Sequence, residues 1–507
     1  MSVELLVAKA TEAEANLDLP KALNTYEEAL ALAPDSLEIA LRLAMLAFRL
    51  SLWPVAEKFY SHLITQGIHD MPIIAGYAAS LREQAKYDEA IDVLKTVLGQ
   101  RPEEATLWEG LGTVMAAQGD SDNALIFFDE ALRLDPENLH ARFNKGCALI
   151  DKGDKTAGLE YLAACANAFD DPDNYASAQI AYAQTLLATG DLENGWRTYD
   201  SRERYGTAQQ VHYALWSQRW REGHPLANRK LLVSGEQGLG DEVLFASILP
   251  DLIRDIGPDG ALWLGVEPRL VSLFQRSFPN AHVIAHRTQT IDGVLQRSFP
   301  DLDSNITDAW AVMGDFLPLY RKQISDFPKT NVYLIPDPAR VTHWRHQMAA
   351  VSDRPKIGIL WKSLKSGTQR DRYFAAFEDW TDLLKLEGVT FVNLQYGDSN
   401  AEMAIATETG LVIHQPQGID LKDDLDDVAA LCASLDIIIA PCNATSNIAA
   451  ACGVPTWLLS LAGGWTQLGQ DQYPWYPNAR LFAPPSLNNW KPALGNIREA
   501  LIERFAL

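Results

Sequence analysis

A glycine-rich turn with two acidic residues follows an apolar segment in the middle of the chain. Residues 231–250 read LLVSGEQGLGDEVLFASILP, the order of strand, turn and helix that a ligand-binding glycine loop requires. Gly238 and Gly240 let the backbone approach a bound group closely, and Asp241 and Glu242 begin the expected helix. Asp241 is a candidate general base. The helix dipole also favours an acid in a first turn, and the spacing alone favours that second explanation.

A cationic loop follows a second apolar segment. After KIGILW at residues 356–361 come Lys362, Ser363 and Lys365, in a chain whose formal net charge is −23. Cations and hydroxyls at the end of a strand suit a phosphate or a diphosphate. A solvated surface loop explains the same residues equally well.

A third apolar segment leads into a helix of small residues. IIIAP at residues 437–441 is followed by Asn443, Ala444, Ser446 and Asn447. Asn443 or Ser446 can cap the helix, and the free N–H groups of its first turn can bind an anion. The position at the end of a strand favours anion binding over plain capping.

An aromatic segment comes next, at residues 461–482, with the sequence LAGGWTQLGQDQYPWYPNARLF. Gly464 belongs to a flexible turn, and Trp465 is the first of several large rings. Such rings stack on a base or a sugar, or they close a hydrophobic core, and the sequence leaves both interpretations open.

Short apolar runs alternate with helical patterns from residue 229 onward. This alternation predicts parallel sheets covered by helices, in two successive Rossmann-like halves. Ligands bind at the carboxyl ends of the strands in such sheets, and a cleft between two halves is the expected site. The runs are residues 231–235, 261–266, 282–286, 356–361, 389–395, 411–414, 437–441 and 456–461.

A helical segment flanked by prolines, PDPARVTHWRHQMAAVSDRP at residues 336–355, interrupts the alternation. We therefore predict an N-terminal half at residues 229–337 and a linker helix at residues 338–354. The C-terminal half then occupies residues 355–507.

The first 205 residues carry a repeat. Ala22, Ala56, Ala90 and Ala124 are each 34 positions apart. The small side chain lets two helices approach closely, and prolines end the second helix of most repeats. The pattern resembles the tetratricopeptide repeat (TPR), in five to six copies, followed by a junction at residues 206–228. Stacked repeats form a concave surface that binds an extended peptide or a partner protein; mere support of the second half, or dimerisation, is the alternative.

Composition excludes several classes of protein. The chain of 507 residues has 43 Lys and Arg against 66 Asp and Glu, which argues against a duplex nucleic-acid binder and a polybasic membrane anchor. It contains no run of 18 apolar residues, and its start does not read as a signal peptide. The five cysteines form no CxxC pair. We therefore expect a cytoplasmic protein with reduced thiols, no membrane span and no metal site.

Together these motifs resemble bacterial TPR-linked glycosyltransferases, whose catalytic half is similar to the heptosyltransferase group of the GT-B fold. The resemblance covers essentially the whole chain and rests on the repeats, GEQGLGDEVLFASILP, ILWKS, LQYGD, NATSNIAAACGVPTWLL and DQYPWYPNARLF. It implies an N-terminal TPR α-solenoid followed by a GT-B fold of two Rossmann-like domains. It also implies metal-independent transfer from a nucleotide sugar without a further cofactor. The acceptor would bind in the N-terminal half and the donor mainly in the C-terminal half. The fold of the family also implies that a final segment at residues 488–505 could cross back to the N-terminal half, a point that the sequence alone leaves open.

The resemblance also carries roles over to single residues. Asp241 matches the aspartate that acts as general base on the acceptor hydroxyl, and Lys362 and Ser363 match the loop that binds the donor phosphate. The residues expected to bind the donor are Lys362, Ser363, Lys365, Gln395, Asn443, Ala444, Ser446, Asn447, Gly464 and Trp465. The residues expected in the acceptor-side loop are Gly238, Gly240 and Glu242.

The chain departs from heptosyltransferases at the donor helix. Cys442, Asn443 and Asn447 stand where those enzymes have Asp-Thr and then His, which suggests a donor other than a heptose. Members with the same NAT-S-N and YPWYP sequences modify flagellin, often with a nonulosonic acid from a CMP donor. The predicted function is transfer of a sugar from a nucleotide sugar to a Ser or Thr hydroxyl of a protein held by the repeats, with flagellin as the leading acceptor. Two alternatives stay open: a non-catalytic TPR adaptor with a degenerate transferase half, and a glycolipid or lipopolysaccharide glycosyltransferase.

Overall fold

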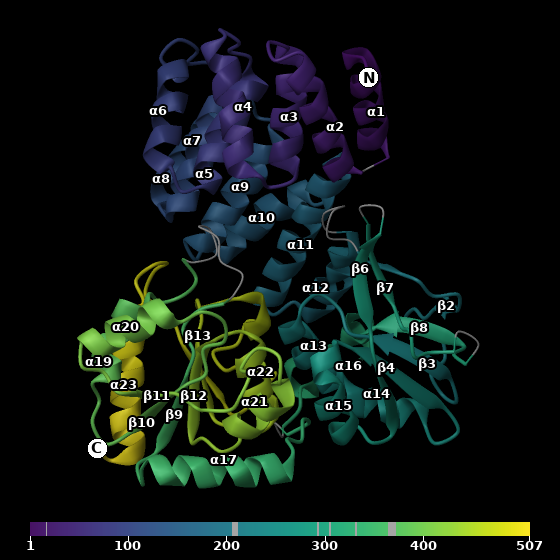
Figure 1. Cartoon of the computed structure of the whole chain (residues 1–507), viewed down its shortest axis with the longest axis vertical. Helices are drawn as coiled ribbons and strands as arrows, with labels where there is room; N and C mark the ends of the chain where they lie inside the picture. Colours follow the sequence, from purple (N-terminus) through teal and green to yellow (C-terminus); the bar gives the residue numbers. More distant parts are fainter. Residues whose placement is uncertain (17, 205–210, 292–293, 304–305, 330–331, 364–371) are drawn as a thin grey trace. The chain divides into compact units, whose positions relative to one another are not determined.

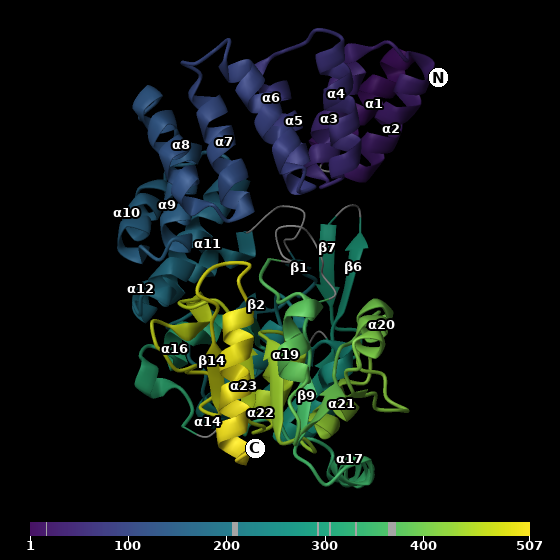
Figure 2. The ribbon, with the colours of Figure 1, turned by 90° about the vertical axis from the view of Figure 1, so that its left-hand side faces the viewer.

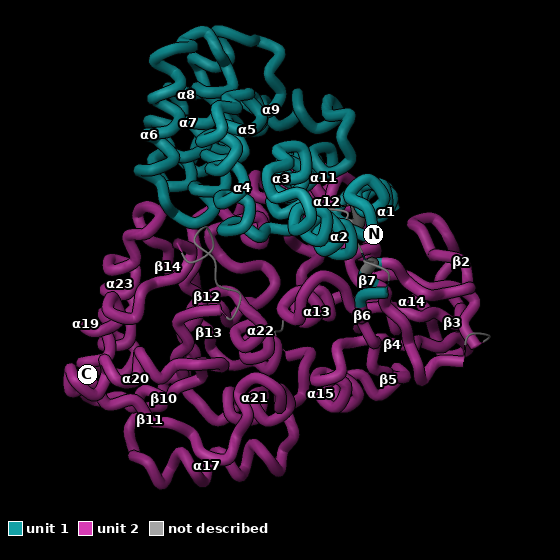
Figure 3. Tube along the Cα trace, turned by 45° about the horizontal axis from the view of Figure 1, so that its top comes forward, with its two compact units in different colours: residues 1–182, 201–211, 290–295 teal, residues 183–200, 212–289, 296–507 magenta. Residues whose placement is uncertain are grey.

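The computed structural model describes the chain except at residues 17, 205–210, 292–293, 304–305, 330–331 and 364–371. The described residues form two compact units, coloured teal and magenta in Figure 3. The first unit comprises residues 1–182, 201–211 and 290–295, and the second comprises residues 183–200, 212–289 and 296–507. The second unit therefore includes the last helix that the repeat pattern assigns to the region 1–205.

Paired antiparallel helices form the N-terminal region, where each helix contacts the next along the chain from residues 3–15 to residues 155–165 (Figures 1 and 2). The alanines that carry the period, among them Ala22 and Ala124, are completely buried, because the two helices of a pair meet there. Gly112 is equally constrained, since an added Cβ atom would lie 2.5 Å from the ring of Phe128. The helices are α1 (Val3–Ala15), α2 (Leu19–Leu32), α3 (Leu37–Arg49), α4 (Trp53–Thr65), α5 (Met71–Glu83), α6 (Tyr87–Leu98), α7 (Ala105–Gln118), α8 (Ser121–Leu134), α9 (Leu139–Asp151), α10 (Lys155–Cys165), α11 (Pro172–Ala188) and α12 (Leu192–Tyr199).

The N-terminal half of the α/β region is built on a five-stranded parallel sheet in the order β2-β8-β3-β4-β5. The direction of the strand order reverses between β3 and β8, so the turn after β3 lies at the topological switch point, where open sheets bind ligands. The strands are β2 (Gln218–Arg219), β3 (Lys230–Ser234), β4 (Ala261–Val266), β5 (Ala281–Ala285) and β8 (Ala309–Val312). The helices are α13 (Leu239–Phe245), α14 (Leu249–Ile256), α15 (Val271–Ser277) and α16 (Leu317–Tyr320). A separate three-stranded sheet, in the order β1-β7-β6, contains β1 (Val211–Tyr213), β6 (Arg287–Ile291) and β7 (Val294–Ser298).

The C-terminal half has a six-stranded parallel sheet in the order β11-β10-β9-β12-β13-β14. In chain order this is the Rossmann arrangement, and its switch point lies between β9 and β12. All five residues of β12 are buried, which explains their unbroken apolar sequence. The strands are β9 (Lys356–Ile359), β10 (Thr390–Asn393), β11 (Ile413–His414), β12 (Ile437–Pro441), β13 (Thr456–Leu459) and β14 (Ala479–Phe482). The helices are α17 (Pro338–Val351), α19 (Thr381–Leu384), α20 (Asn400–Glu408), α21 (Leu425–Cys432), α22 (Ala444–Ala451) and α23 (Lys491–Phe505).

The predicted fold class is confirmed: helical repeats precede two Rossmann-like halves of a GT-B fold. Each of the eight apolar runs contains a strand, whereas β2, β8 and β14 of the two parallel sheets were missed. These strands have two to four residues and no long apolar run, so their sequence does not distinguish them from loops.

The final helix packs on the C-terminal half and does not cross back to the N-terminal half. α23 buries Leu494, Ile497 and Leu501 in the core of the C-terminal half, with Trp380 and Trp457. The apolar stripe of α23 is buried there, because β14 and α19 present a matching apolar surface.

The aromatic segment after β13 reaches the N-terminal half instead. The ring of Trp475 lies 5.0 Å from that of Phe327 and 6.0 Å from that of Phe245, centroid to centroid. Trp475 is completely buried, so this tryptophan closes the core between the halves rather than offering a face to a ligand.

Candidate active site

Asp241 lies in the first turn of α13, directly after the switch point of the N-terminal sheet. Its Oδ2 accepts the N–H of Gly238 at 3.1 Å, and the side chain is partly buried. Burial raises the pKa of Asp241 to about 6, the N–H of Gly238 opposes this, and the nearby charges of Glu236 and Glu242 raise the pKa further. A carboxyl group with a pKa near 6 is suited to accept a proton close to neutral pH.

Two glutamates, Glu242 and Glu236, fix the turn that carries Asp241 by hydrogen bonds to the backbone of neighbouring segments. Glu242 is buried and accepts the N–H of Glu267 at 2.9 Å, and its Oε1 lies 3.0 Å from Nε2 of His286. Glu236 is also buried and accepts the N–H of Gly314, across the switch point, at 2.6 Å. The structure therefore places Glu242 beneath the acceptor-side loop, as a buried support of the turn that carries Asp241.

The turn that contains Gly240 packs directly against α22. The backbone oxygen of Gly240 accepts a hydrogen bond from Nδ2 of Asn447 at 2.9 Å. A Cβ atom on Gly240 would lie 3.3 Å from Nδ2 of Asn447 and 3.4 Å from the backbone nitrogen of Ala444, so a larger residue would fit only closely against α22. α13 and α22 thus bring the switch points of the two sheets together (Figure 1). The side-chain amide of Asn447 is therefore engaged in the contact between α13 and α22.

Asn443 and Ser446 form a reciprocal cap at the start of α22. Asn443 Oδ1 accepts the N–H of Ser446 at 3.1 Å, and Ser446 Oγ accepts the N–H of Asn443 at 2.9 Å. Ser446 Oγ also donates to the backbone oxygen of Pro441 at 2.9 Å, so Ser446 is a capping residue. Nδ2 of Asn443 is enclosed and has no hydrogen-bond partner among the described residues. A buried donor without a partner calls for an acceptor, and a bound ligand supplies one.

Lys362 follows β9, on the other side of the switch point of the C-terminal sheet. Its Nζ forms an ion pair with Glu402, whose Oε1 also lies 3.4 Å from Nε1 of Trp361. Burial favours the neutral form of Glu402, but the hydrogen bonds from Lys362, from its own N–H and from Trp361 outweigh it and lower its pKa. Ser363 is partly buried beside Lys362. Lys365 lies outside the described residues.

Gln395 holds the Lys362 turn rather than facing a site. It is buried, and its Oε1 accepts the N–H groups of Trp361 at 3.1 Å and of Lys362 at 3.0 Å. Its Nε2 donates to the backbone oxygens of Lys362 at 3.2 Å and of Tyr396 at 2.9 Å. Both ends of the amide are thereby engaged, so Gln395 positions Lys362 through the backbone.

Gly464 and Trp465 lie in the aromatic segment, at the start of a short 3₁₀ turn. The ring of Trp465 lies 5.4 Å from that of Tyr199 and 6.4 Å from that of Trp196. Of the two interpretations left open for these rings, the contacts of Trp465 favour core closure.

Tyr473 was missed by the sequence reasoning. It is buried, it forms a hydrogen bond with Thr466, and it lies close enough to Cys442 and Asp241 to interact with their charges. Burial chiefly, and then the charges of Cys442 and Asp241, raise the pKa of Tyr473 well above its ordinary value, so its phenol stays protonated. The YPWYP sequence was the available signal, although it does not distinguish Tyr473 from the rings that only fill the core.

Cys442 stands between β12 and the cap of α22. Its side chain is exposed, yet the protein around it raises the pKa of the thiol to about 11, against hydrogen bonds with Ser460 and Tyr473. The thiol is protonated near neutral pH and is therefore a poor nucleophile.

Ion pairs also join the two α/β halves, between α15 and its preceding turn on one side and the start of α21 on the other. Arg276, on α15, donates to both carboxylate oxygens of Asp426, with Nη1 and Oδ2 3.1 Å apart. Arg269 reaches Asp423 at 3.3 Å. The acids at the start of α21 are therefore partners of the N-terminal half.

Breaking the central pair is expected to destabilise the protein. Because the side chains of Arg276 and Asp426 are only 24% and 12% exposed, Arg276→Met should lower the free energy of unfolding by about 1–3 kcal/mol, between the values for surface and buried pairs. Arg254→Met is the matched control, because Arg254 also binds two aspartates but is 64% exposed, and it should cost less than about 1 kcal/mol. Urea unfolding of both variants measures the difference. Equal losses in the free energy of unfolding would show that the ion pair between Arg276 and Asp426 contributes nothing.

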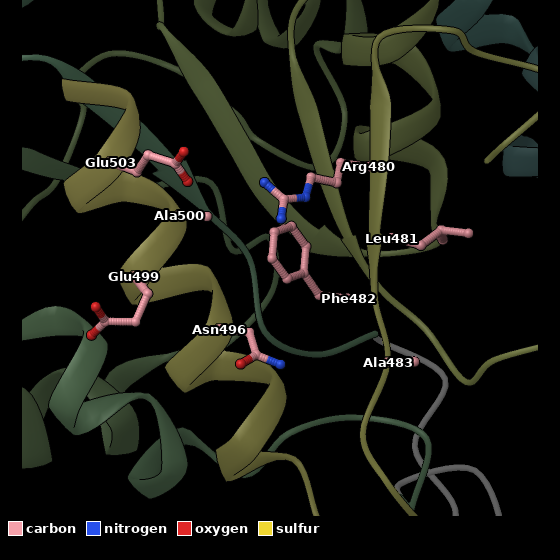
Figure 4. A pocket seen from close by; sticks show the side chains of 8 residues that line it. All are labelled: Arg480, Leu481, Phe482, Ala483, Asn496, Glu499, Ala500 and Glu503. Carbon is pink, nitrogen blue, oxygen red and sulfur yellow. The ribbon is translucent and has the colours of Figure 1, made fainter. Parts of the chain in front are cut away.

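A separate surface pocket of about 360 Å³ lies between β14 and α23. Figure 4 shows the guanidinium of Arg480 beside the ring of Phe482, with Glu499 and Glu503 on the facing helix. None of the site residues named above lines this pocket. Among the described residues there is no cluster of three or more His, Cys, Asp or Glu arranged to hold a metal ion. No described helix has the length and apolarity that crossing a membrane requires.

Comparison with known proteins identifies the helical repeats and two solved structures with partial similarity. The family model of the tetratricopeptide repeat matches residues 7–70 and 78–138. A thermophilic TPR protein of Thermus thermophilus is 22% identical, with a TM-score of 0.30, over 35% of this chain and 98% of that one. The ADP-heptose LPS heptosyltransferase II of E. coli is 14% identical, with a TM-score of 0.39, over 55% of this chain and 97% of that one.

One relative spans nearly the whole chain. Protein FlbA of Caulobacter vibrioides is 44% identical over 486 residues, which are 96% of this chain and 81% of FlbA. The chain therefore belongs to the family of Protein FlbA.

Proposed function

We propose that the protein is a glycosyltransferase that moves a sugar from a nucleotide-sugar donor to a Ser or Thr hydroxyl of an acceptor protein held by the repeats. One observation carries the proposal. Asp241, with a pKa of about 6, lies at the switch point of one sheet and packs, through Gly240, against the helix at the switch point of the other. A base on one side and a phosphate-binding helix on the other is the pair of groups that glycosyl transfer needs.

The reaction that we propose is a direct displacement. The carboxylate of Asp241 takes the proton of the acceptor hydroxyl as its oxygen attacks the anomeric carbon. The bond between that carbon and the phosphate oxygen breaks, and the nucleotide leaves as an anion. Lys362, the free N–H groups at the start of α22 and Nδ2 of Asn443 stabilise the charge that develops on the phosphate. Asp241 then releases its proton to water, and the mechanism uses no metal or further cofactor.

The repeats supply the acceptor in this proposal. Stacked repeats bind protein segments, and holding the acceptor beside the transferase raises its effective concentration there. The departure from heptosyltransferases at Cys442, Asn443 and Asn447 supports a donor other than a heptose. We propose a CMP-nonulosonic acid as the donor and flagellin as the acceptor, with transfer in the cytoplasm.

A non-catalytic adaptor is the second candidate, and one observation favours it. Asn447 stands where heptosyltransferases have histidine, and its side chain is occupied by Gly240. The deciding experiment incubates the protein with purified flagellin and a CMP-nonulosonic acid, and measures flagellin by intact-protein mass spectrometry. A mass gain of one sugar per modified site supports the transferase. Binding of flagellin without any mass gain, with CMP-, UDP-, GDP- and ADP-sugars alike, supports the adaptor.

The rate of transfer should depend on pH through Asp241. Because only the ionised carboxylate accepts a proton and its pKa is about 6, kcat/KM should rise as pH increases, reach half its maximum near pH 6 and level off above it. Initial rates between pH 4.5 and 8.5 test this, with stability checked at each pH. A profile that is flat across pH 6 would exclude Asp241 as the base.

A further inference from the structure

The last helix of the repeat pattern is built into the α/β unit. Residues 183–200, which contain α12, belong to the second unit (Figure 3). On this helix, Trp196 is buried, and its Nε1 donates to the backbone oxygen of Arg321 at 2.8 Å. Its ring lies 6.3 Å from that of Trp475. These contacts fix one face of α12 against the N-terminal half and the aromatic segment.

Tyr199, one turn further along α12, contacts the turn that carries Asp241. Nε2 of Gln237 donates to the hydroxyl oxygen of Tyr199 at 2.9 Å, and Oε1 of the same amide lies 3.3 Å from that oxygen. Tyr199 is buried, and its ring also lies against that of Trp465 on the donor side. One side chain thus contacts both the acceptor-side turn and the aromatic segment of the C-terminal half.

Gln237 adopts a backbone conformation that needs support. Its φ is +57°, in the left-handed region that residues other than glycine, asparagine and aspartate seldom occupy. The next residue is Gly238, whose N–H binds the carboxylate of Asp241. A shift of Gln237 toward an ordinary φ would redirect that N–H group and release the carboxylate.

We propose that Tyr199 is a positioning residue for Asp241. Its hydroxyl holds the side chain of Gln237, this keeps the backbone of Gln237 at positive φ, and the N–H of Gly238 therefore stays aimed at Asp241. The role of Asp241 as the base rests on the proposed function, whereas the mechanical link from Tyr199 to the turn does not. The final helix of the repeat pattern is in this way part of the catalytic apparatus.

Tyr199→Phe in the full-length protein tests the link, because it removes the hydroxyl and keeps the ring against Trp465. We expect kcat to fall about 10- to 100-fold with little change in KM for the donor, since displacing a catalytic group by a fraction of an ångström costs this much. The half-maximal pH of kcat/KM should move above 6, because the N–H of Gly238, which lowers the pKa of Asp241, is no longer held against the carboxylate. Amide hydrogen exchange should become faster in residues 236–242 and stay unchanged in the rest of the second unit.

Tyr320→Phe is the matched control, because it removes a tyrosine hydroxyl that binds Asp255 at 3.0 Å, away from the turn. It should leave the pH profile and the exchange of residues 236–242 unchanged. Gln237→Gly removes the amide and accepts the positive φ, so adding Tyr199→Phe to it should cause no further change in exchange.

The outcomes separate the two proposals. Unchanged exchange and an unchanged pH profile in Tyr199→Phe would overturn the positioning role. Faster exchange confined to the turn supports that role even where no sugar transfer is detected in the wild type, a result that would overturn the proposed function alone. A loss of protection throughout the second unit would overturn the positioning role in favour of a general structural one.

Discussion

Asp241→Asn should lower the rate of sugar transfer about 10²–10⁴-fold, the contribution of a well-placed general base. Asparagine keeps the shape of the side chain, and its oxygen still accepts the N–H of Gly238, which lies 3.1 Å from the aspartate oxygen. It cannot take a proton from the acceptor hydroxyl. Binding of the nucleotide should be unchanged, because the residues proposed to hold the phosphate lie in the C-terminal half.

The same variant should be more stable than the wild type above pH 6. The folded state raises the pKa of Asp241 from 3.8 to about 6, so between these values it binds a proton that the unfolded chain has released. Stability from this group therefore falls as pH rises through that window, and at pH 8 the buried carboxylate costs about 2–3 kcal/mol. Asp241→Asn removes the charge, so it should gain up to this amount at pH 8 and nothing below pH 4.

Asp259→Asn is the control for both measurements, because Asp259 is exposed and lies in the turn before β4, at the opposite end of the sheet. It should change neither transfer nor stability appreciably. Full transfer activity in Asp241→Asn would remove Asp241 from the mechanism. A stability gain that is equal at pH 4 and pH 8 would show that the carboxylate is not desolvated in the folded state.

Lys362→Ala should weaken binding of the nucleotide about 10- to 100-fold, since a charge-assisted hydrogen bond contributes about 1.5–3 kcal/mol. Lys362 follows the carboxyl end of β9, the strand that borders the switch point between β9 and β12, where an open sheet binds phosphates. A nucleotide at about 100 times its dissociation constant stabilises the folded protein by about 2.7 kcal/mol. Thermal unfolding with CMP, UDP, GDP and ADP in turn should give one selective shift in the wild type and little shift in the variant.

The ion pair of Lys362 requires a second variant. Lys362→Ala leaves the carboxylate of Glu402, which is 14% exposed, without its main partner, and this alone lowers stability. The double variant Lys362→Ala with Glu402→Gln should recover that stability and still fail to bind the nucleotide. Lys356→Ala, at the amino end of β9, is the matched control and should bind like the wild type. Normal binding by Lys362→Ala would exclude the lysine from the donor site.

The elements themselves follow from local patterns in the sequence. Alanines at 34-residue spacing and apolar runs that each fill one strand identify the helical repeats and eight strands of the two sheets. Each pattern reports one element, because amphipathic periodicity depends on residues a few positions apart. The cap of α22 could also be predicted from the sequence, because Asn443 and Ser446, which bind each other, are only three positions apart.

The roles of single polar residues were harder to predict from the sequence than the elements, because their hydrogen-bond partners are distant along the chain. Gln395 resembles a ligand-binding amide until its two N–H donors, 33 and 34 positions earlier, are seen. Asn447 resembles a donor-binding residue until Gly240, 207 positions earlier, is placed beside it.

The sequence by itself determined the fold class, the order of the elements and the turns that lie at the switch points, because these depend on local periodicity and on short motifs. Only the tertiary structure decided that α12 belongs to the α/β unit, that the aromatic segment rather than α23 reaches the N-terminal half, and that Asp241 has a pKa near 6. The physical reason is common to all three. Burial, and the choice of partner for a ring or a charge, depend on contacts between segments that are distant along the chain, and no local pattern records them.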